Sequence, residues 1–267
     1  MKTEATSLDA TRHRLLEGVL LRLARRPDAE GLVLRGGMLL RHWFRPIARP
    51  ADDLDLVATS PFGVAEATRL FLPLFTEGGI DDGAAYDAER VRAEAICLDT
   101  GSPGMRVFAS GEFGGNEADF HVDVTVGPAP RPAPVFGDLP TACGKPVRVW
   151  MCRPESIVGQ KMQALTHLGM LCWRPKDLDD LRILLARIPL DADETRGAIA
   201  ASFAVLGRTW ADARTLFGPG AWWGMKRSSA RWFDFVKSAR RPDVPRDLAA
   251  VVAEVAGRLA PILEGLP

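Results

Sequence analysis

The chain has 267 residues, enough for one large domain or two small ones, and 47% of them are hydrophobic while 25% are charged. This composition is ordinary for a globular protein and excludes a disordered or membrane-spanning chain, because no run approaches the roughly 18 apolar residues of a spanning helix. Basic and acidic residues balance at 34 each, so net charge indicates no partner. The N-terminus lacks the apolar segment of a signal peptide, and we expect a cytoplasmic protein without a membrane partner.

The first half of the chain combines helix-like and strand-like patterns. The predicted helices cover residues 8–26, 38–44 and 64–75. The predicted strands cover residues 31–34, 53–57, 90–98, 105–110, 120–126 and 147–151. Five prolines between residues 128 and 140 exclude a helix or a central strand there and predict an extended loop.

The chain after Pro154 shows helical periodicity throughout. The predicted helices cover residues 154–171, 176–187, 192–206, 208–217, 227–240 and 244–263. This change of pattern predicts a boundary near residue 150. The fold class is therefore α+β, with a mixed α/β domain over residues 1–150 and an all-helical domain over residues 151–267.

Gly36 and Gly37 lie between the predicted strand 31–34 and the predicted helix 38–44. Glycine permits a tight turn and lets a ligand approach the backbone closely. The start of the following helix offers unpaired N–H groups and a partial positive charge that suit phosphate. Taken alone, however, a Gly-Gly pair is more often a simple turn.

Asp53 and Asp55 stand two residues apart in a predicted strand, so their side chains project from the same face. Two neighbouring carboxylates repel each other, and a protein tolerates this most readily when a cation lies between them. Oxygen ligands of this kind suit Mg²⁺. Taken alone, the pair is slightly better explained as an exposed acidic strand end that includes Asp52.

Together, the two features form the arrangement that a nucleotidyltransferase needs. The glycines cradle the triphosphate of an NTP, and the carboxylates hold metal that activates the attacking oxygen and stabilises the pyrophosphate leaving group. Asp123 is expected to complete the metal site, because it lies mid-strand between valines where an unpaired charge would be costly. Asp119 is the less favoured alternative because it lies nearer the strand end.

Four motifs resemble those of the AbiEii/AbiGii-type nucleotidyltransferase toxins. The Gly-Gly turn and residues 49–56 are similar to the family's Gly-Gly-Ser/Thr turn and Arg-x-Ser-x-Asp-hydrophobic-Asp strand. Residues 155–165 are similar to the family's lysine-bearing helix, and residues 174–181 to its Arg-x-Lys-Asp-x-x-Asp-Leu element. The motifs lie in the family's order over residues 31–185.

The resemblance implies a DNA polymerase β-like nucleotidyltransferase core followed by a helical C-terminal domain. It also implies a toxin that is paired with a separate antitoxin and that, in some family members, transfers nucleotides onto the acceptor end of tRNA. Two positions depart from the family pattern: Met38 replaces the Ser or Thr after Gly-Gly, and Ala51 replaces the Ser before the aspartate pair. Met38 removes a hydroxyl donor to phosphate, and the two departures leave nucleotide affinity and choice open.

The resemblance also extends the site into the helical half. Lys161 is expected to reach the triphosphate as a compact positive charge, and Asp177 to orient Lys161 or a substrate hydroxyl. Spacing alone favours simpler interpretations, namely a surface lysine and a helix-capping carboxylate with Asp180 facing solvent. Arg49 is expected to brace its loop or contact phosphate, and His121 is interpreted as structural.

Residues 220–241 hold six basic residues, three tryptophans and the single acid Asp234. Basic residues interleaved with aromatic ones can bind RNA through phosphate contacts and base stacking. Trp232 and Phe235 lie at helical core spacing, however, so we expect core packing for the aromatics and an RNA-facing role for the basic residues.

The sequence thus predicts an Mg²⁺-dependent nucleotidyltransferase that moves an NMP from an NTP to an acceptor, expected to be RNA such as the tRNA acceptor end, with a cognate antitoxin as a further partner. The predicted catalytic residues are Asp53, Asp55, Asp123, Lys161 and Asp177, the first three as metal ligands, and the predicted nucleotide-binding residues are Gly36, Gly37, Arg49 and Lys161. One rival is an enzyme that modifies a small molecule, as antibiotic nucleotidyltransferases do. Another is a catalytically silent module that binds RNA or protein, which the departures at Met38 and Ala51 support and the retained aspartate pair opposes.

Overall fold

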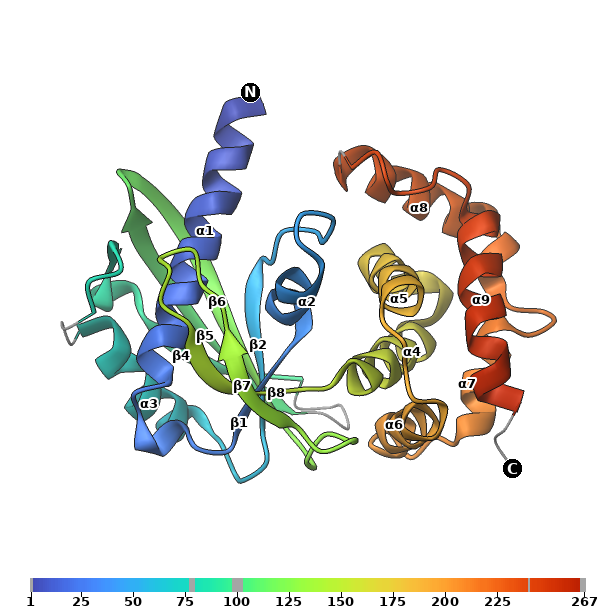
Figure 1. Ribbon diagram of the computed structural model, residues 1–267, viewed down its shortest axis with the longest axis horizontal. Helices are drawn as coiled ribbons and strands as arrows, with labels where there is room; N and C mark the ends of the chain where they lie inside the picture. Colours follow the sequence, from blue (N-terminus) through green and yellow to red (C-terminus); the bar gives the residue numbers. More distant parts are fainter. Residues whose placement is uncertain (1, 77–79, 98–102, 240, 265–267) are drawn as a thin grey trace. The chain divides into compact units, whose positions relative to one another are not determined.

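The computed structural model describes residues 2–76, 80–97, 103–239 and 241–264 (Figure 1). The chain forms two compact units. The first consists of residues 1–129 and 134–151, and the second of residues 130–133 and 152–267. The chain therefore enters the second unit briefly, returns to the first, and enters the second again.

A mixed sheet of eight strands forms the centre of the first unit. Its order is β3-β5-β6-β2-β1-β8-β7, and β4 also pairs with β5. The strands are β1 (Leu32–Arg35), β2 (Asp53–Ala58), β3 (Ala84–Tyr86), β4 (Arg92–Ile96), β5 (Gly104–Phe113), β6 (Asn116–Val126), β7 (Val135–Leu139) and β8 (Val147–Met151). β2 runs parallel to β6 and β1 parallel to β8, while the other pairs are antiparallel.

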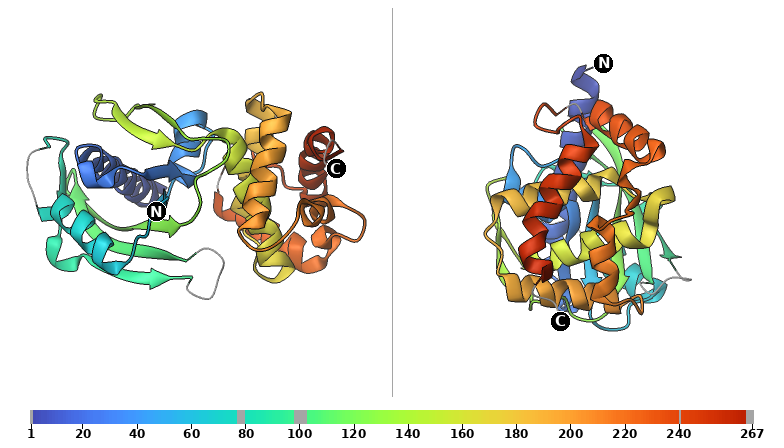
Figure 2. Two further views of the ribbon diagram at one scale, coloured as in Figure 1. Left: turned by 90° about the horizontal axis from the view of Figure 1, so that it is seen from below. Right: turned by 90° about the vertical axis from the view of Figure 1, so that its right-hand side faces the viewer.

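Alternation along β2 and β6 gives the sheet one apolar face and one polar face. The apolar face carries Leu54, Val122 and Val124, which are fully buried. Helices α1 (Lys2–Leu23) and α3 (Val64–Thr76) pack on it (Figures 1 and 2). Each buried side chain of this size stabilises the fold by about 1.5–3 kcal/mol. The polar face is therefore the one on which charged side chains can gather.

Helix α2 (Gly36–Phe44) begins directly where β1 ends. Its start lies two residues before the predicted helix 38–44, so both glycines belong to its first turn. Met38 and Leu39 are buried and hold α2 in the core of the first unit. The burial of Met38 and Leu39 therefore fixes the position of Gly36 and Gly37 at the start of α2.

The buried Glu17 of α1 is the centre of a polar network that includes Arg45, the residue directly after α2. The Glu17 carboxylate accepts hydrogen bonds from Arg45 Nη2 at 3.0 Å and from the Ala142 backbone N–H at 2.9 Å. His13 Nε2 lies 3.0 Å from Glu17 Oε1, one turn earlier on α1. Burial lowers the pKa of His13 below its ordinary value of 6.5, and the charges of Arg41 and Arg45 act in the same direction against the opposing effect of Glu17.

The free energy of unfolding should fall as the pH drops through about 6.5. The unfolded chain takes up a proton on His13 near that pH, whereas the folded chain, whose His13 pKa is lowered, takes it up only at a lower pH. Burial also lowers the pKa of His42, which contributes in the same sense. Urea denaturation at a series of pH values between about 8 and 5 measures the slope. His13→Gln should flatten it and the exposed His167→Gln should not; equal slopes for His13→Gln and wild type would contradict the prediction.

The second unit is helical. Its helices are α4 (Pro154–Cys172), α5 (Pro175–Arg187), α6 (Ala192–Ala204), α7 (Trp210–Phe217), α8 (Lys226–Ala239) and α9 (Leu248–Glu264). α4 and α6 approach closely at Gly159, where an added Cβ would lie 2.5 Å from the Ala198 carbonyl oxygen. No helix among the described residues is long and apolar enough to span a bilayer.

The prediction of an extended loop over residues 128–140 is wrong for its second part. Residues 135–139 form β7, which pairs with β8 only, at the edge of the sheet. The prolines stand before and after this stretch rather than inside it, and an edge strand needs hydrogen bonds on one side only. β3 was not predicted, because three residues are too short for a recognisable alternation.

Candidate functional site

A row of charged residues crosses the polar face of the sheet. Strand register places Arg35 of β1 opposite Asp55 of β2, Asp55 opposite Asp123 of β6, and Asp123 opposite Arg106 of β5. Directly opposite residues project from the same face of a sheet with their Cβ atoms about 5 Å apart. The row therefore places two carboxylates in the middle with an arginine at either end.

The neighbouring row brings a histidine to the same face. Asp53 of β2 lies opposite His121 of β6. One oxygen of Asp53, one oxygen of Asp123 and one ring nitrogen of His121 all lie within 4.8 Å of one another. His121 Nε2 is 3.5 Å from Asp53 Oδ2 and 4.0 Å from Asp123 Oδ2. We call these three residues the acidic group; two carboxylates and an imidazole form a donor set that can hold a divalent ion.

Asp55 lies against the first turn of α2. A Cβ added at Gly36 would meet Asp55 Oδ2 at 1.9 Å, and Gly36 also has a left-handed φ of +72°. Glycine is therefore required here twice, for its backbone conformation and for the space that the carboxylate fills. Among the described residues, Asp55 does not belong to the acidic group, so the predicted set of Asp53, Asp55 and Asp123 comes together only in part.

Asp123 has a partner that the sequence did not indicate. Arg106 donates from Nε to Asp123 Oδ1 and from Nη2 to Asp123 Oδ2, each at 2.7 Å. Hydrogen bonding to Asp123 is the main cause that raises the pKa of Arg106. The mid-strand carboxylate is therefore ion-paired in this structure. Asp119, the alternative to Asp123, lies on the surface and pairs with Arg90 at 3.3 Å; it is not near the strand end, because β6 begins at Asn116.

Arg49 lies beside the second glycine. Its guanidinium nitrogens would be 3.3 and 3.4 Å from a Cβ added at Gly37, and Nη1 donates to the Pro50 carbonyl at 3.1 Å. Arg49 thus braces the loop before β2, which is one of its two predicted roles. The side chains of Met38 and Ala51 are both buried, so the two departures from the family pattern form part of the core.

Lys161 and Asp177 belong to the second unit, where they meet. Lys161 Nζ lies 2.7 Å from Asp177 Oδ1 and 2.8 Å from Asp180 Oδ2, and Arg174 Nε donates to Asp177 Oδ2 at 2.9 Å. Asp177 and Asp180 are three residues apart on one face of α5, which packs against α4. The side chain of Lys161 is 12% exposed, and Asp180 is buried. The simpler interpretation from spacing alone, in which Asp180 faces solvent, is therefore wrong: Asp180 is buried and Lys161 compensates its charge.

The aromatic side chains of residues 220–241 mostly pack inside the second unit, as predicted. Trp223 and Trp232 are buried, and the Trp232 ring centroid lies 5.2 Å from that of Phe235. Phe233 is different, because it is 65% exposed. The basic residue Arg240 lies outside the described residues.

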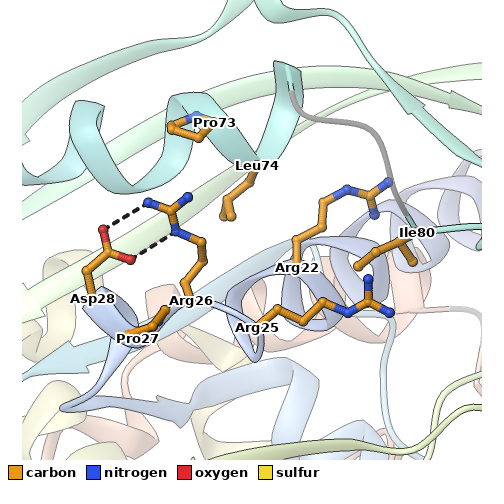
Figure 3. Close-up of a pocket in the computed structure, with 8 residues that line it drawn as sticks. All are labelled: Arg22, Arg25, Arg26, Pro27, Asp28, Pro73, Leu74 and Ile80. Carbon is orange, nitrogen blue, oxygen red and sulfur yellow. Dashed lines mark hydrogen bonds and ion pairs between the residues drawn. The ribbon is translucent and has the colours of Figure 1, made fainter.

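A separate pocket of about 460 Å³ lies at the C-terminal end of α1 (Figure 3). It is lined by Arg22, Arg25, Arg26, Pro27, Asp28, Pro73, Leu74 and Ile80. Arg26 holds Asp28 through two hydrogen bonds of 2.9 and 3.0 Å (Figure 3), and Arg22 holds Asp82 at 2.6 Å. The pocket contains none of the predicted site residues, and two of its arginines are engaged by carboxylates of the chain.

Sequence reasoning missed His121 and Arg106 as members of the site. His121 alternates with Asp119 and Asp123 on the polar side of β6, so the same-face signal was present, but an isolated histidine carries little weight without knowledge of the opposite strand. Arg106 could be placed only by the register of β5 against β6, which residue spacing does not determine.

One family of proteins and two solved structures are similar to this chain. The model of the nucleotidyl transferase AbiEii toxin family, of the type IV toxin–antitoxin system, matches residues 18–256. Two solved structures are similar, one of a protein from H. pylori described as a candidate nucleotidyltransferase and one of JHP933 from Helicobacter pylori. Each is 14% identical with a TM-score of 0.50, and the matches cover 94% of this chain and 93% and 90% of the two others. No curated protein matches the chain.

The structural likeness at 14% identity supports the fold, an α+β arrangement with a mixed sheet and C-terminal helices. The family match covers most of the chain and all of the motifs quoted above. This chain therefore belongs to the AbiEii nucleotidyl transferase toxin family of type IV toxin–antitoxin systems and is a nucleotidyltransferase.

Proposed function

We propose that this chain transfers a nucleoside monophosphate from an NTP to an RNA acceptor, at the acceptor end of tRNA, and acts as the toxin beside a cognate antitoxin. The observation that carries the proposal is the placement of Asp53 and Asp55 on one face of β2, with Asp53 in the acidic group and Asp55 against Gly36 at the start of α2. Family membership supports the reaction and implies an antitoxin partner and a nucleotide substrate. Residues 1–150 form the catalytic core in this proposal, and residues 151–267 a helical domain that carries Lys161 and Asp177.

The first turn of α2 is the proposed phosphate cradle. The backbone N–H groups of a helix start have no partners within the helix, and the helix dipole favours an anion there. The space that a Cβ at Gly36 would take holds the Asp55 carboxylate, and the Arg49 guanidinium lies beside the Cβ position of Gly37, so a phosphate at this turn would lie next to both groups. Met38 is buried, so the cradle relies on backbone donors and on Arg49, which lies beside Gly37.

Asp53, Asp55 and Asp123 are the proposed ligands of Mg²⁺, and His121 lies among them as an additional donor. When bound, Mg²⁺ would neutralise charge on the triphosphate and lower the pKa of the acceptor hydroxyl. The protein's own contribution is placement, because strand pairing fixes the two carboxylates of β2 next to the start of α2. A triphosphate held by the cradle then lies beside the acidic group.

Lys161 is proposed to contact the triphosphate, and Asp177 to hold Lys161 in position. The ammonium group is compact and strongly charged, and the contacts with Asp177 and Asp180 fix its location. These two contacts argue against the interpretation of Lys161 as an ordinary surface lysine, because a surface lysine would not lie between two buried carboxylates.

Helix α8 is the proposed RNA surface. Phe233 is exposed, and Lys226, Ala230 and Lys237 are exposed at helical spacing on the same side. An exposed ring flanked by lysines suits single-stranded RNA, because a base stacks on the ring while the lysines contact phosphates.

The protein should label a discrete RNA band when it is incubated with α-labelled NTPs one at a time, total RNA and Mg²⁺. Binding to that RNA should weaken steeply with salt, because contacted phosphates release counterions. Phe233→Ala should weaken RNA binding about tenfold, since stacking contributes about 1–3 kcal/mol per base. Its melting temperature should stay unchanged, because the ring is exposed.

The control for the RNA surface is Phe136→Ala, since Phe136 is also half exposed but lies on β7 of the first unit. Equal loss of RNA binding in the two variants would remove α8 as the RNA surface. Label on small molecules alone would favour an antibiotic-type enzyme. Absence of label with every NTP, with either Mg²⁺ or Mn²⁺, would favour a silent binding module.

A further inference from the structure

We propose that Arg106 is a resident cation of the metal site, which holds Asp123 when no divalent ion is bound and moves to Glu94 when an ion takes Asp123. The inference rests on the proposed metal-binding role of the acidic group. It goes further by assigning a positioning role to two residues outside that group, and it predicts how tightly the site binds a divalent ion.

The first observation is how fully Arg106 engages Asp123. Both carboxylate oxygens accept a hydrogen bond from the guanidinium, each at 2.7 Å. Such a two-pronged pair occupies the outward-pointing lone pairs that a metal would use. Asp123 is 14% exposed and Arg106 34%, so the pair is only partly screened by water. An ion that binds Asp123 must therefore share or displace the guanidinium.

The second observation is charge. A guanidinium stays protonated at every physiological pH, so Arg106 keeps its positive charge when a divalent ion binds nearby. A divalent ion among Asp53, His121 and Asp123 would lie close to this fixed positive charge and be repelled by it. With Arg106 in place, the site therefore binds a divalent ion less tightly than the same carboxylates would without it.

The third observation is that the sheet supplies Arg106 with an alternative partner. Strand register places Arg106 between Asp123 of β6 and Glu94 of β4, and all three project from one face. Opposite side chains on neighbouring strands are close enough for an ion pair of this length. Glu94 is exposed, so it can receive the guanidinium without rearrangement of the core.

Arg92, the other arginine beside Phe108, has a different partner from Arg106. The Arg92 guanidinium lies 4.1 Å above the Phe108 ring, whereas that of Arg106 is 6.0 Å from the same ring. Phe108 in turn lies beside His121. Arg92 is thus held by stacking, and Arg106 by Asp123.

The test is a titration of the full-length protein with Mn²⁺ alone, in which free Mn²⁺ is measured by electron paramagnetic resonance. Arg106→Gln should bind Mn²⁺ about tenfold more tightly than wild type, a difference of ~1.4 kcal/mol. Glu94→Gln should bind it several-fold more weakly, because the displaced guanidinium loses its second partner. In an Asp123→Asn background, Arg106→Gln should change the affinity far less than in wild type, which a double-mutant cycle measures.

The matched control is Arg90→Gln, which removes the exposed ion pair with Asp119, another residue of β6, and should leave Mn²⁺ binding unchanged. Unchanged or weaker binding in Arg106→Gln, with normal binding in wild type, would overturn the role of Arg106 and leave the proposed function standing. Absence of Mn²⁺ binding in wild type and in every variant would overturn the metal site and this inference together. Should Arg106→Gln fail to fold, Arg106→Lys and Glu94→Gln still decide: unchanged affinity in both overturns the proposal.

Discussion

Asp55→Asn should reduce nucleotide transfer by on the order of 10³-fold, because a divalent ion contributes several kcal/mol to the transition state and about 1.4 kcal/mol corresponds to tenfold in rate. Asp55 lies opposite Asp123 in the sheet and against Gly36 in the first turn of α2. Asparagine keeps the shape that fills the space above Gly36 while it removes the charge. Transfer of label to RNA and the melting temperature, measured on the same preparation, separate loss of activity from loss of fold.

Asp52→Asn is the matched control for this variant. Asp52 belongs to the same run of acids, but its side chain is 56% exposed and its ion pairs with Arg12 and Arg49 are long, at 3.9 and 4.0 Å. It should transfer nucleotides at the wild-type rate. Full activity in Asp55→Asn, or wild-type activity in the presence of EDTA, is the result that would refute a carboxylate-bound metal.

Transfer should fall by about 100-fold or more when Lys161 is replaced in a way that preserves the fold, as expected when a preorganised charge is lost. Lys161→Ala is a poor choice, because it removes the cation that lies between the buried carboxylates of Asp177 and Asp180 and should cost about 3–5 kcal/mol of stability. The double variant Lys161→Met with Asp180→Asn removes one positive and one negative charge together. The transfer rate and the melting temperature are the two measurements.

Further variants separate a role in transfer from a role in stability. Lys161→Arg keeps the charge between the two aspartates and should keep the melting temperature, yet it should transfer poorly because a guanidinium has a different reach. Asp177→Asn should impair transfer if Asp177 positions Lys161. Lys145→Ala, an exposed lysine of the first unit, controls for the loss of a lysine. Wild-type transfer in the folded double variant would show that Lys161 lies outside the active site.

The fold could be predicted where a pattern is local. Alternation in residues 120–126 and the spacing of Asp53 and Asp55 depend on the two-residue period of a strand, and the structure confirms both as same-face arrangements. Strand β7 could not be predicted, because its place at the edge of the sheet depends on β8 and not on its own residues. Prolines on both sides masked a five-residue strand between them.

In the candidate site, too, features set by a short segment of sequence could be predicted, whereas features set by contacts between distant segments could not. The helix start at Gly36 and the carboxylate pair on β2 follow from short segments of sequence. Arg106 opposite Asp123 and His121 opposite Asp53 depend on pairing between strands far apart in the chain, which a single sequence leaves open. Burial of Asp180 depends in the same way on the packing of α5 against α4, where Lys161 provides the counter-charge.

The brief entry of residues 130–133 into the second unit has a consequence for anyone who wishes to separate the two units genetically. The Ser156 hydroxyl donates to the Arg131 carbonyl at 2.7 Å, so this short segment is secured by α4 although β7 and β8 follow it in the first unit. A polypeptide that ends at Met151 would carry the segment without Ser156, and one that begins at Cys152 would leave the Ser156 hydroxyl without its acceptor. Separate expression of the halves, or exchange of one half between relatives, therefore requires transplanting residues 130–133 together with the helices and closing the gap before Pro134 with a new linker.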